Sequence, residues 1–102
     1  MAGFEKTRDV DEDIANIVAY TVDRWGVEQV RKYMSGLERR LDEFASGLTI
    51  SKNLDDLIPG LRMVRYEHHY IFGLIRDPQP MLVLAILHEK MDLMERLKGR
   101  LG

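Results

Sequence analysis

Residues 10–44 read VDEDIANIVAYTVDRWGVEQVRKYMSGLERRLDEF, and apolar side chains recur in this stretch at the three- and four-residue spacing of a helix face. They fall into two groups: Val10, Ile14, Ile17, Val18, Thr21 and Trp25, then Val27, Val30, Tyr33, Met34, Leu37, Leu41 and Phe44. Gly26 separates the groups, and glycine readily adopts the left-handed conformation that ends a helix. The stretch therefore predicts two helices, the second from Val27 to about Ser46, folded back as an antiparallel hairpin.

Three strands are predicted after the hairpin, beyond an irregular segment from Gly47 to Pro59. Leu61–Tyr66 is mixed in character, His69–Arg76 is largely apolar and aromatic, and Met81–Leu87 is apolar throughout. The linker 77–80 has a turn composition, so the last two strands form a β-hairpin. Strands with so little polar alternation are usually covered on both faces.

The flanking segments complete the predicted fold. Phe4–Lys6 can form one brief strand before the helices. The helical hairpin covers one face of the sheet, and the other face needs either the C-terminal segment Met91–Leu101, whose apolar residues lie at helical spacing, or a partner molecule. The predicted class is α+β: a short N-terminal strand, an antiparallel helical hairpin packed on a three-stranded antiparallel sheet, and a short C-terminal helix or tail.

A chain of 102 residues fits a single domain, 1–102. It has no cysteine, which excludes disulfides and thiolate metal sites. The first residues lack the apolar core of a signal peptide, and the longest apolar run, Met81–Leu87, is too short to cross a membrane. We therefore expect a soluble, cytoplasmic protein with no membrane partner.

The net charge of −2 argues against a generic nucleic-acid binder, because each phosphate contact needs its own Lys or Arg. The charge is unevenly distributed, however. Basic residues gather at Arg62, Arg65, His68 and His69, and in the tail at Arg96, Lys98 and Arg100. A small local basic patch is therefore compatible with the sequence.

The histidines form no recognisable metal site. His68 and His69 are adjacent, so on one strand they would point to opposite faces, and we expect one in the sheet and one in the turn before it. His88 is separate in sequence, and no carboxylate stands at a spacing that completes a site. Without a glycine-rich phosphate loop or a nucleophile elbow, the sequence predicts no metal, no cofactor and no hydrolase chemistry.

Metal-independent cleavage of RNA is harder to dismiss. It needs cations around the scissile phosphate and a group that moves a proton. The candidates are Arg62, Arg65, His68, His69, His88 and Lys90. The spacing favours another interpretation, in which Arg62 and Arg65, three apart on a strand, face opposite sides of the sheet and pair with nearby acids.

Two apolar features have both a structural and a functional interpretation. Trp25 at the bend of the hairpin is more often a core residue at a helix end, and less often an exposed anchor for a partner. The stripe of Met and Leu in the tail is equally compatible with a core helix and with a partner-binding surface.

Three stretches together resemble the ParE branch of the RelE/ParE superfamily. The first is Asp13–Ile17 running into Tyr20–Gly26, and the second is Gly60-Leu61-Arg62 followed by His69–Phe72. The third, Ile86–Asp92, reads ILHEKMD and is very close to the "ILH..MD" of the family. The three keep the order and spacing of the family across nearly the whole chain. The chain departs from it at Gly73, where the family often has Tyr, and in residues 48–53.

The resemblance implies the toxin of a type II toxin–antitoxin pair, neutralised when a ParD-like antitoxin folds onto it. The usual target in the family is DNA gyrase, so the protein would be an inhibitor rather than an enzyme, and it would reach operator DNA only through the antitoxin. A homodimer or a heterotetramer with the antitoxin is compatible with this assignment.

We predict two contact surfaces on this basis. The candidate target-binding residues are Trp25, Arg62, Arg65, Arg96, Lys98 and Arg100. The candidate antitoxin-binding residues are Tyr70, Phe72, Met91, Met94 and Leu97.

The alternative within the superfamily is a RelE-like, ribosome-dependent mRNA endoribonuclease. Its best catalytic residues here would be Arg62, Arg65, His88 and Lys90. Glu67 and Glu89 place negative charge where a phosphate needs cations, and no Tyr follows Tyr70 to act as the C-terminal catalytic residue of that branch. A third alternative is a non-toxic relative that binds only its antitoxin and, through it, operator DNA.

Overall fold

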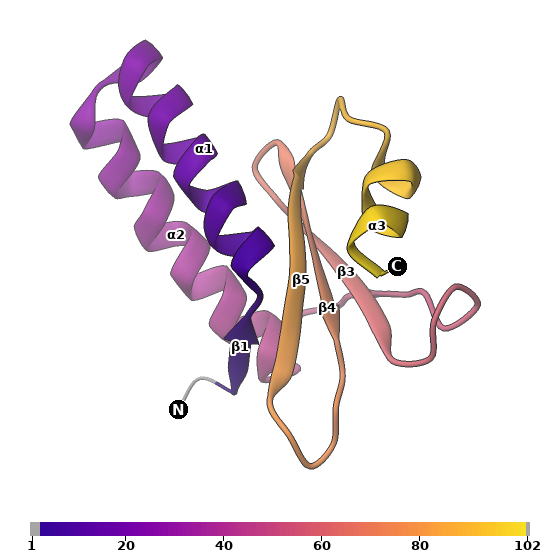
Figure 1. The fold of residues 1–102 in the computed structure, drawn as a ribbon. Helices are drawn as coiled ribbons and strands as arrows, with labels where there is room; N and C mark the ends of the chain where they lie inside the picture. Colours follow the sequence, from indigo (N-terminus) through magenta and orange to yellow (C-terminus); the bar gives the residue numbers. More distant parts are fainter. Residues whose placement is uncertain (1–2, 102) are drawn as a thin grey trace.

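The computed structural model describes residues 3–101, which form one mixed sheet with helices against both faces. In chain order the elements are β1 (Phe4–Lys6), α1 (Arg8–Trp25), α2 (Val27–Ala45), β2 (Lys52–Asn53), β3 (Leu61–Tyr66), β4 (His69–Leu74), β5 (Met81–His88) and α3 (Leu93–Leu101). The strand order is β1-β5-β4-β3-β2, and all neighbours are antiparallel except β1 and β5. Figure 1 shows the hairpin of α1 and α2 on one side of the sheet and α3 on the other.

The predicted α+β class is confirmed, but the predicted three-stranded sheet is too small. β3, β4 and β5 are the expected antiparallel strands, and β1 and β2 extend the sheet at its two edges. β1 was expected as a strand, and its parallel pairing with β5 adds it to the sheet. β2 lies in the segment predicted to be irregular, because two residues are too few to show an alternating pattern.

The helical hairpin forms for the reasons that the sequence indicates. Thr7 caps α1, its side-chain oxygen accepting a hydrogen bond from the Val10 backbone N–H at 3.2 Å. Gly26, with φ of 87°, ends α1 and donates its N–H to the carbonyl of Val22 at 3.1 Å. Neither these helices nor α3, within residues 3–101, has the length and apolar character needed to span a membrane.

The sheet separates two apolar clusters, as the lack of polar alternation in its strands predicts. On the hairpin side the buried residues are Val10, Leu37, Leu41, Phe44, Val64, Ile71, Met81, Val83 and Ile86. On the other side they are Leu61, Phe72, Leu84, Ala85, Leu87 and Leu97. The C-terminal segment is therefore a docked helix, which resolves the choice between core helix and free apolar stripe for its central residue, Leu97.

Two glycines allow close packing that a side chain would prevent. A Cβ on Gly36 would lie 2.1 Å from the Tyr66 hydroxyl oxygen, so the lack of a side chain at Gly36 lets α2 pack closely against β3. The Tyr66 hydroxyl donates to the backbone carbonyl of Tyr33 at 2.8 Å. A Cβ on Gly73 would lie 2.6 Å from the sulfur of Met81, which fills the space that Tyr would need at this position.

The outer edge of β5 is closed by an ion pair instead of a strand. β1 pairs only with Met81–Val83, and beyond that point the Ile86 backbone N–H donates to the Asp13 carboxylate at 3.0 Å. Arg100 of α3 donates to the carbonyl of Leu84 at 3.0 Å and to Asp13 at 2.7 and 3.0 Å. The hydrogen bonds that Arg100 donates to Asp13 raise the pKa of Arg100, so the guanidinium stays charged. This bridge joins α1, β5 and α3.

Replacing Arg100 by Ala should lower the free energy of unfolding by about 3 kcal/mol, because the Asp13 carboxylate would be left nearly buried without its counter-charge. Arg96→Ala on the exposed face of the same helix should cost less than about 0.5 kcal/mol. Urea unfolding of both variants at pH 7 measures the difference. Equal stability of the two variants would show that the bridge contributes nothing.

Candidate protein-binding groove

A groove of about 980 Å³ lies between the helical hairpin and the end of the sheet. The helices contribute Ile17, Tyr20, Trp25, Lys32 and Tyr33 to its lining. The sheet contributes His68, His69, Ile86 and His88, and Met91 follows β5 at the rim. Tyr20 and Trp25 are 58% and 70% exposed, which is unusual for side chains of this size. The lining is mainly apolar and aromatic with a few polar groups, as in a site that binds a partner.

The three histidines gather on the sheet side of this groove. The ring centroids of His69 and His88 lie 5.2 Å apart, and those of His68 and His88 lie 6.4 Å apart. His69 is in β4 and His68 is in the turn before it, as expected from their adjacency. Because His68 leaves the strand, both rings can approach His88. Among residues 3–101 no group of three or more His, Cys, Asp or Glu is arranged to hold a metal ion.

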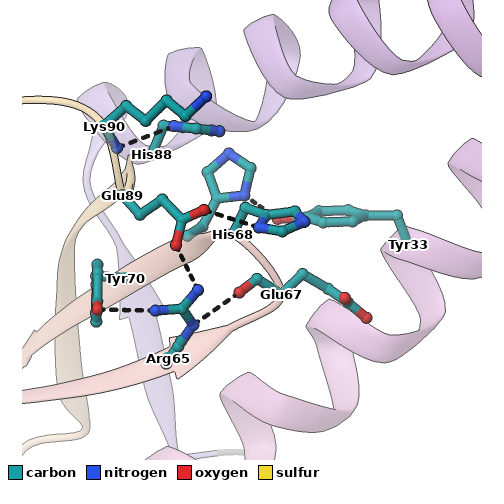
Figure 2. Close-up of polar contacts among 9 residues, drawn as sticks. Tyr33, Arg65, Glu67, His68, Tyr70, His88, Glu89 and Lys90 are labelled. Carbon is teal, nitrogen blue, oxygen red and sulfur yellow. Dashed lines mark hydrogen bonds and ion pairs between the residues drawn. The ribbon is translucent and has the colours of Figure 1, made fainter.

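Each histidine has its Nδ1 atom engaged by a neighbouring group. His68 Nδ1 lies 2.8 Å from a Glu89 carboxylate oxygen, and His69 Nδ1 lies 2.9 Å from the Tyr33 hydroxyl. His88 Nδ1 accepts the backbone N–H of Lys90 at 3.1 Å. Figure 2 shows the contacts of His68 with Glu89 and of His88 with Lys90, which hold these two rings against the turn and the end of β5.

Burial keeps the interior of this cluster uncharged. Desolvation, with the nearby charges of His88 and His68, lowers the pKa of His69 from 6.5 to about 4. Desolvation also raises the pKa of Tyr33, so its phenol retains the proton. The contact between His69 and Tyr33 is therefore a hydrogen bond between neutral groups at pH 7.

Glu89 links the histidine cluster to the other face of the sheet. Its carboxylate accepts hydrogen bonds from His68 and from Arg65, and these lower the pKa of Glu89. Arg65 also donates to the Tyr70 hydroxyl at 2.9 Å and lies over the Tyr70 ring at 5.3 Å. The Arg65 guanidinium is thus paired with Glu89, just after β5, and with Tyr70 in the adjacent strand.

Of the four candidate nuclease residues, Arg62 lies apart from the others, at the opposite end of β3 from His88. Arg62 pairs with Asp55 at 2.8 Å, a contact that lowers the pKa of Asp55 to about 2. Arg62 and Arg65 point to opposite faces of β3 and each pairs with an acid, as the spacing favoured. His88 lines the groove beside the hairpin, and its Nδ1 accepts the backbone N–H of Lys90.

The predicted target-binding residues are also dispersed. Trp25 lies at the rim of the groove, so its interpretation as a core residue is wrong. The basic tail is not one patch, because the Arg100 side chain is 19% exposed and pairs with Asp13 and Asp9. Arg96 and Lys98 are exposed on α3. Helical spacing alone did not show which of these cations would form an ion pair within the protein.

The predicted antitoxin-binding residues divide between core and surface. Phe72 and Leu97 are 0% and 1% exposed and pack together in the cluster under α3, so neither offers a surface. Tyr70 is half-buried, and Met91 and Met94 are each 42% exposed. The sequence could not separate them, because an apolar stripe has the same spacing whether a helix of the chain or a partner covers it.

The groove itself was not predicted. Tyr33 and His69 are 36 residues apart and meet only because α2 packs across the sheet. Tyr20 and Lys32 occupy helix positions whose spacing does not distinguish the groove from solvent. The signal in the sequence was that several lining residues, among them Tyr20, His69 and His88, fall in the stretches that carry the family resemblance.

The chain thus combines a two-helix hairpin on one face of the sheet, a short helix on the other and a groove beside the hairpin. Residues 4–93 match the family model described as ParE toxin of type II toxin-antitoxin system, parDE. The chain therefore belongs to the ParE toxin family, and the resemblance in its sequence is confirmed.

Similar proteins agree with this assignment. Toxin ParE of Escherichia coli is 46% identical over 101 residues, which cover 99% of this chain and 98% of that protein. Toxin ParE1 of Mycobacterium tuberculosis (strain CDC 1551 / Oshkosh) is 32% identical over 72 residues, or 71% of this chain and 74% of that protein. A chain of the structure titled "Chromosomal ParDE TA system from P. aeruginosa" has a TM-score of 0.69 at 16% identity. This match covers 86% of this chain and 96% of the other, and it shows the fold alone.

The neutral state of His69 makes stability depend on pH. Its pKa of about 4 in the folded state lies below the unfolded value of about 6.5, so below pH 6.5 the unfolded chain binds more protons. Stability should therefore fall between pH 6.5 and 4, by about 1–2 kcal/mol for this ring once screening by solvent is allowed for. Urea unfolding at several pH values should show a smaller loss for His69→Gln. An unchanged pH dependence in that variant would rule out His69 as the source.

Proposed function

We propose that this chain is a cytoplasmic, single-domain toxin that inhibits DNA gyrase by binding it and is neutralised by direct contact with a ParD-like antitoxin. The observation that carries the proposal is the groove between hairpin and sheet, in which exposed aromatic side chains stand beside polar ones. Membership of the ParE toxin family supplies the biological context.

The groove suits a folded segment of the antitoxin. A space of about 980 Å³ can take several large apolar side chains from one face of a helix. Tyr20, Trp25 and Met91 would lose exposed apolar surface on binding, and each Å² removed from water is worth about 25 cal/mol. A contact with DNA would then come through the antitoxin, in keeping with the net charge of −2.

The target surface is proposed to include the tip of the hairpin. Trp25 projects there, and tryptophan is frequent among the residues that dominate binding energy at interfaces. Arg96 and Lys98 add exposed positive charge on α3. Arg62 and Arg65 are less suited to this role, because a partner would have to break their ion pairs.

The arrangement favours binding over catalysis. A nuclease needs free cations around the phosphate, whereas Arg62 and Arg65 are neutralised by Asp55 and Glu89. No observation favours the ribosome-dependent endoribonuclease over an inhibitor. If that activity existed, His88→Gln would have to reduce mRNA cleavage by orders of magnitude.

The decisive experiment is supercoiling of relaxed plasmid by gyrase, with purified toxin titrated in and antitoxin added back. We expect inhibition with trapped cleaved DNA, reversed by the antitoxin. Trp25→Ala should raise the inhibitory concentration about tenfold or more, because an anchoring aromatic side chain is lost. Ile75→Ala, at an exposed apolar residue outside the groove lining, should have little effect. Undisturbed gyrase at high toxin excess would overturn the proposal and direct the same preparation to an mRNA cleavage assay.

A further inference from the structure

The hydrogen bonds around His88 determine which of its ring nitrogens carries a proton. Its Nδ1 accepts the backbone N–H of Lys90, so in the neutral ring that nitrogen is unprotonated. The proton is therefore on Nε2, which makes Nε2 a donor. The ring lines the groove, and Figure 2 shows it directed toward the helices. The groove thus contains a hydrogen-bond donor held in place by the turn after β5.

The other charged groups of the groove decide what this donor can meet. From α1, Asp13 is already satisfied by Arg100 and the Ile86 N–H. From α2, Lys32 lines the groove and forms no ion pair within residues 3–101. Glu67, in the exposed turn, carries a carboxylate without an ion pair among the same residues, and in Figure 2 His68 lies between it and His88.

At the histidine end of the groove, His68 and His69 are already bonded to Glu89 and Tyr33, so the free N–H donor there is that of His88. When His68 is neutral and donates from Nδ1 to the Glu89 carboxylate, its Nε2 is an acceptor. The His69 ring is half-buried and is held by Tyr33 and by edge-to-face contact with His88. A partner segment that covers this end of the groove therefore meets an N–H donor on one wall and an ammonium group on the other.

We infer that His88 and Lys32 together recognise a carboxylate side chain of the antitoxin segment that occupies the groove, flanked by apolar residues that pack on Tyr20 and Trp25. The inference rests on the proposed function. A carboxylate satisfies both the imidazole N–H and the ammonium group, and burying either of them without an acceptor would disfavour binding. Charged donors and acceptors also fix the register of a segment that apolar contacts alone would leave free to slide.

The test measures the affinity of the full chain for the antitoxin of the same operon by isothermal titration calorimetry. His88→Leu, which removes the donor, should weaken binding about tenfold, and His88→Gln, whose amide can still donate, should retain most of the affinity. Lys32→Gln should weaken binding severalfold at low salt and reduce the loss of affinity between 50 and 500 mM NaCl. Lys52→Gln, at an exposed lysine outside the groove, is the matched control. Thermal unfolding of each variant checks that it is folded.

The outcomes separate this inference from the proposed function. Loss of affinity in Trp25→Ala but none in His88→Leu or Lys32→Gln would overturn carboxylate recognition and leave the groove as the antitoxin site. Unchanged affinity in all three variants would overturn the groove itself as that site. Weaker binding by His88→Gln than by His88→Leu would also contradict the inference, because the donor would then be irrelevant.

Discussion

The free edge of β5 is the feature on which the positions of both helical layers depend. Beyond Val83, β1 no longer pairs with β5, and the outer backbone groups of Leu84 and Ile86 need other partners. Asp13 and Arg100 provide these partners while pairing with each other. One ion pair therefore closes the sheet edge and fixes α1 on one face and α3 on the other. Neither helix could move without leaving a charge or a backbone group unsatisfied.

The groove follows from where this anchor lies along the hairpin. Asp13 is near the start of α1, and the buried residues of the hairpin, Val10, Leu37, Leu41 and Phe44, lie at the same end of the two helices. The end at Gly26 has no such contacts, and Figure 1 shows it leaning away from the sheet. The aromatic residues of that end therefore remain exposed, and the space beside them is a consequence of anchoring the hairpin at one end only.

Sequence periodicity predicted the helices and strands well, but it predicted poorly which of their side chains are buried and which are exposed. It located the hairpin and the three main strands, because these need long apolar stripes. It missed β2, which is too short to have a pattern, and it left both Trp25 and the apolar stripe of the tail open between core and surface. Phe72 and Leu97, which were assigned to the antitoxin surface together with the resemblance, are buried. Spacing identifies which face of an element is apolar, whereas the covering of that face depends on contacts between distant segments. The pairing of Tyr33 with His69 is of the same kind and could not be predicted.

The same contacts explain why the few polar groups of the mainly apolar groove carry little charge. The arginines on β3 form ion pairs with Asp55 and Glu89, and Arg100 pairs with Asp13 at the edge of β5. Burial keeps His69 neutral at pH 7. The polar groups that remain in the groove therefore act mainly through directional hydrogen bonds and not through a strong electrostatic potential. Such groups discriminate between partners by geometry, since an ill-matched partner leaves them unsatisfied. For the antitoxin site proposed above, specificity for one antitoxin is therefore a more natural property than affinity for any polyanion.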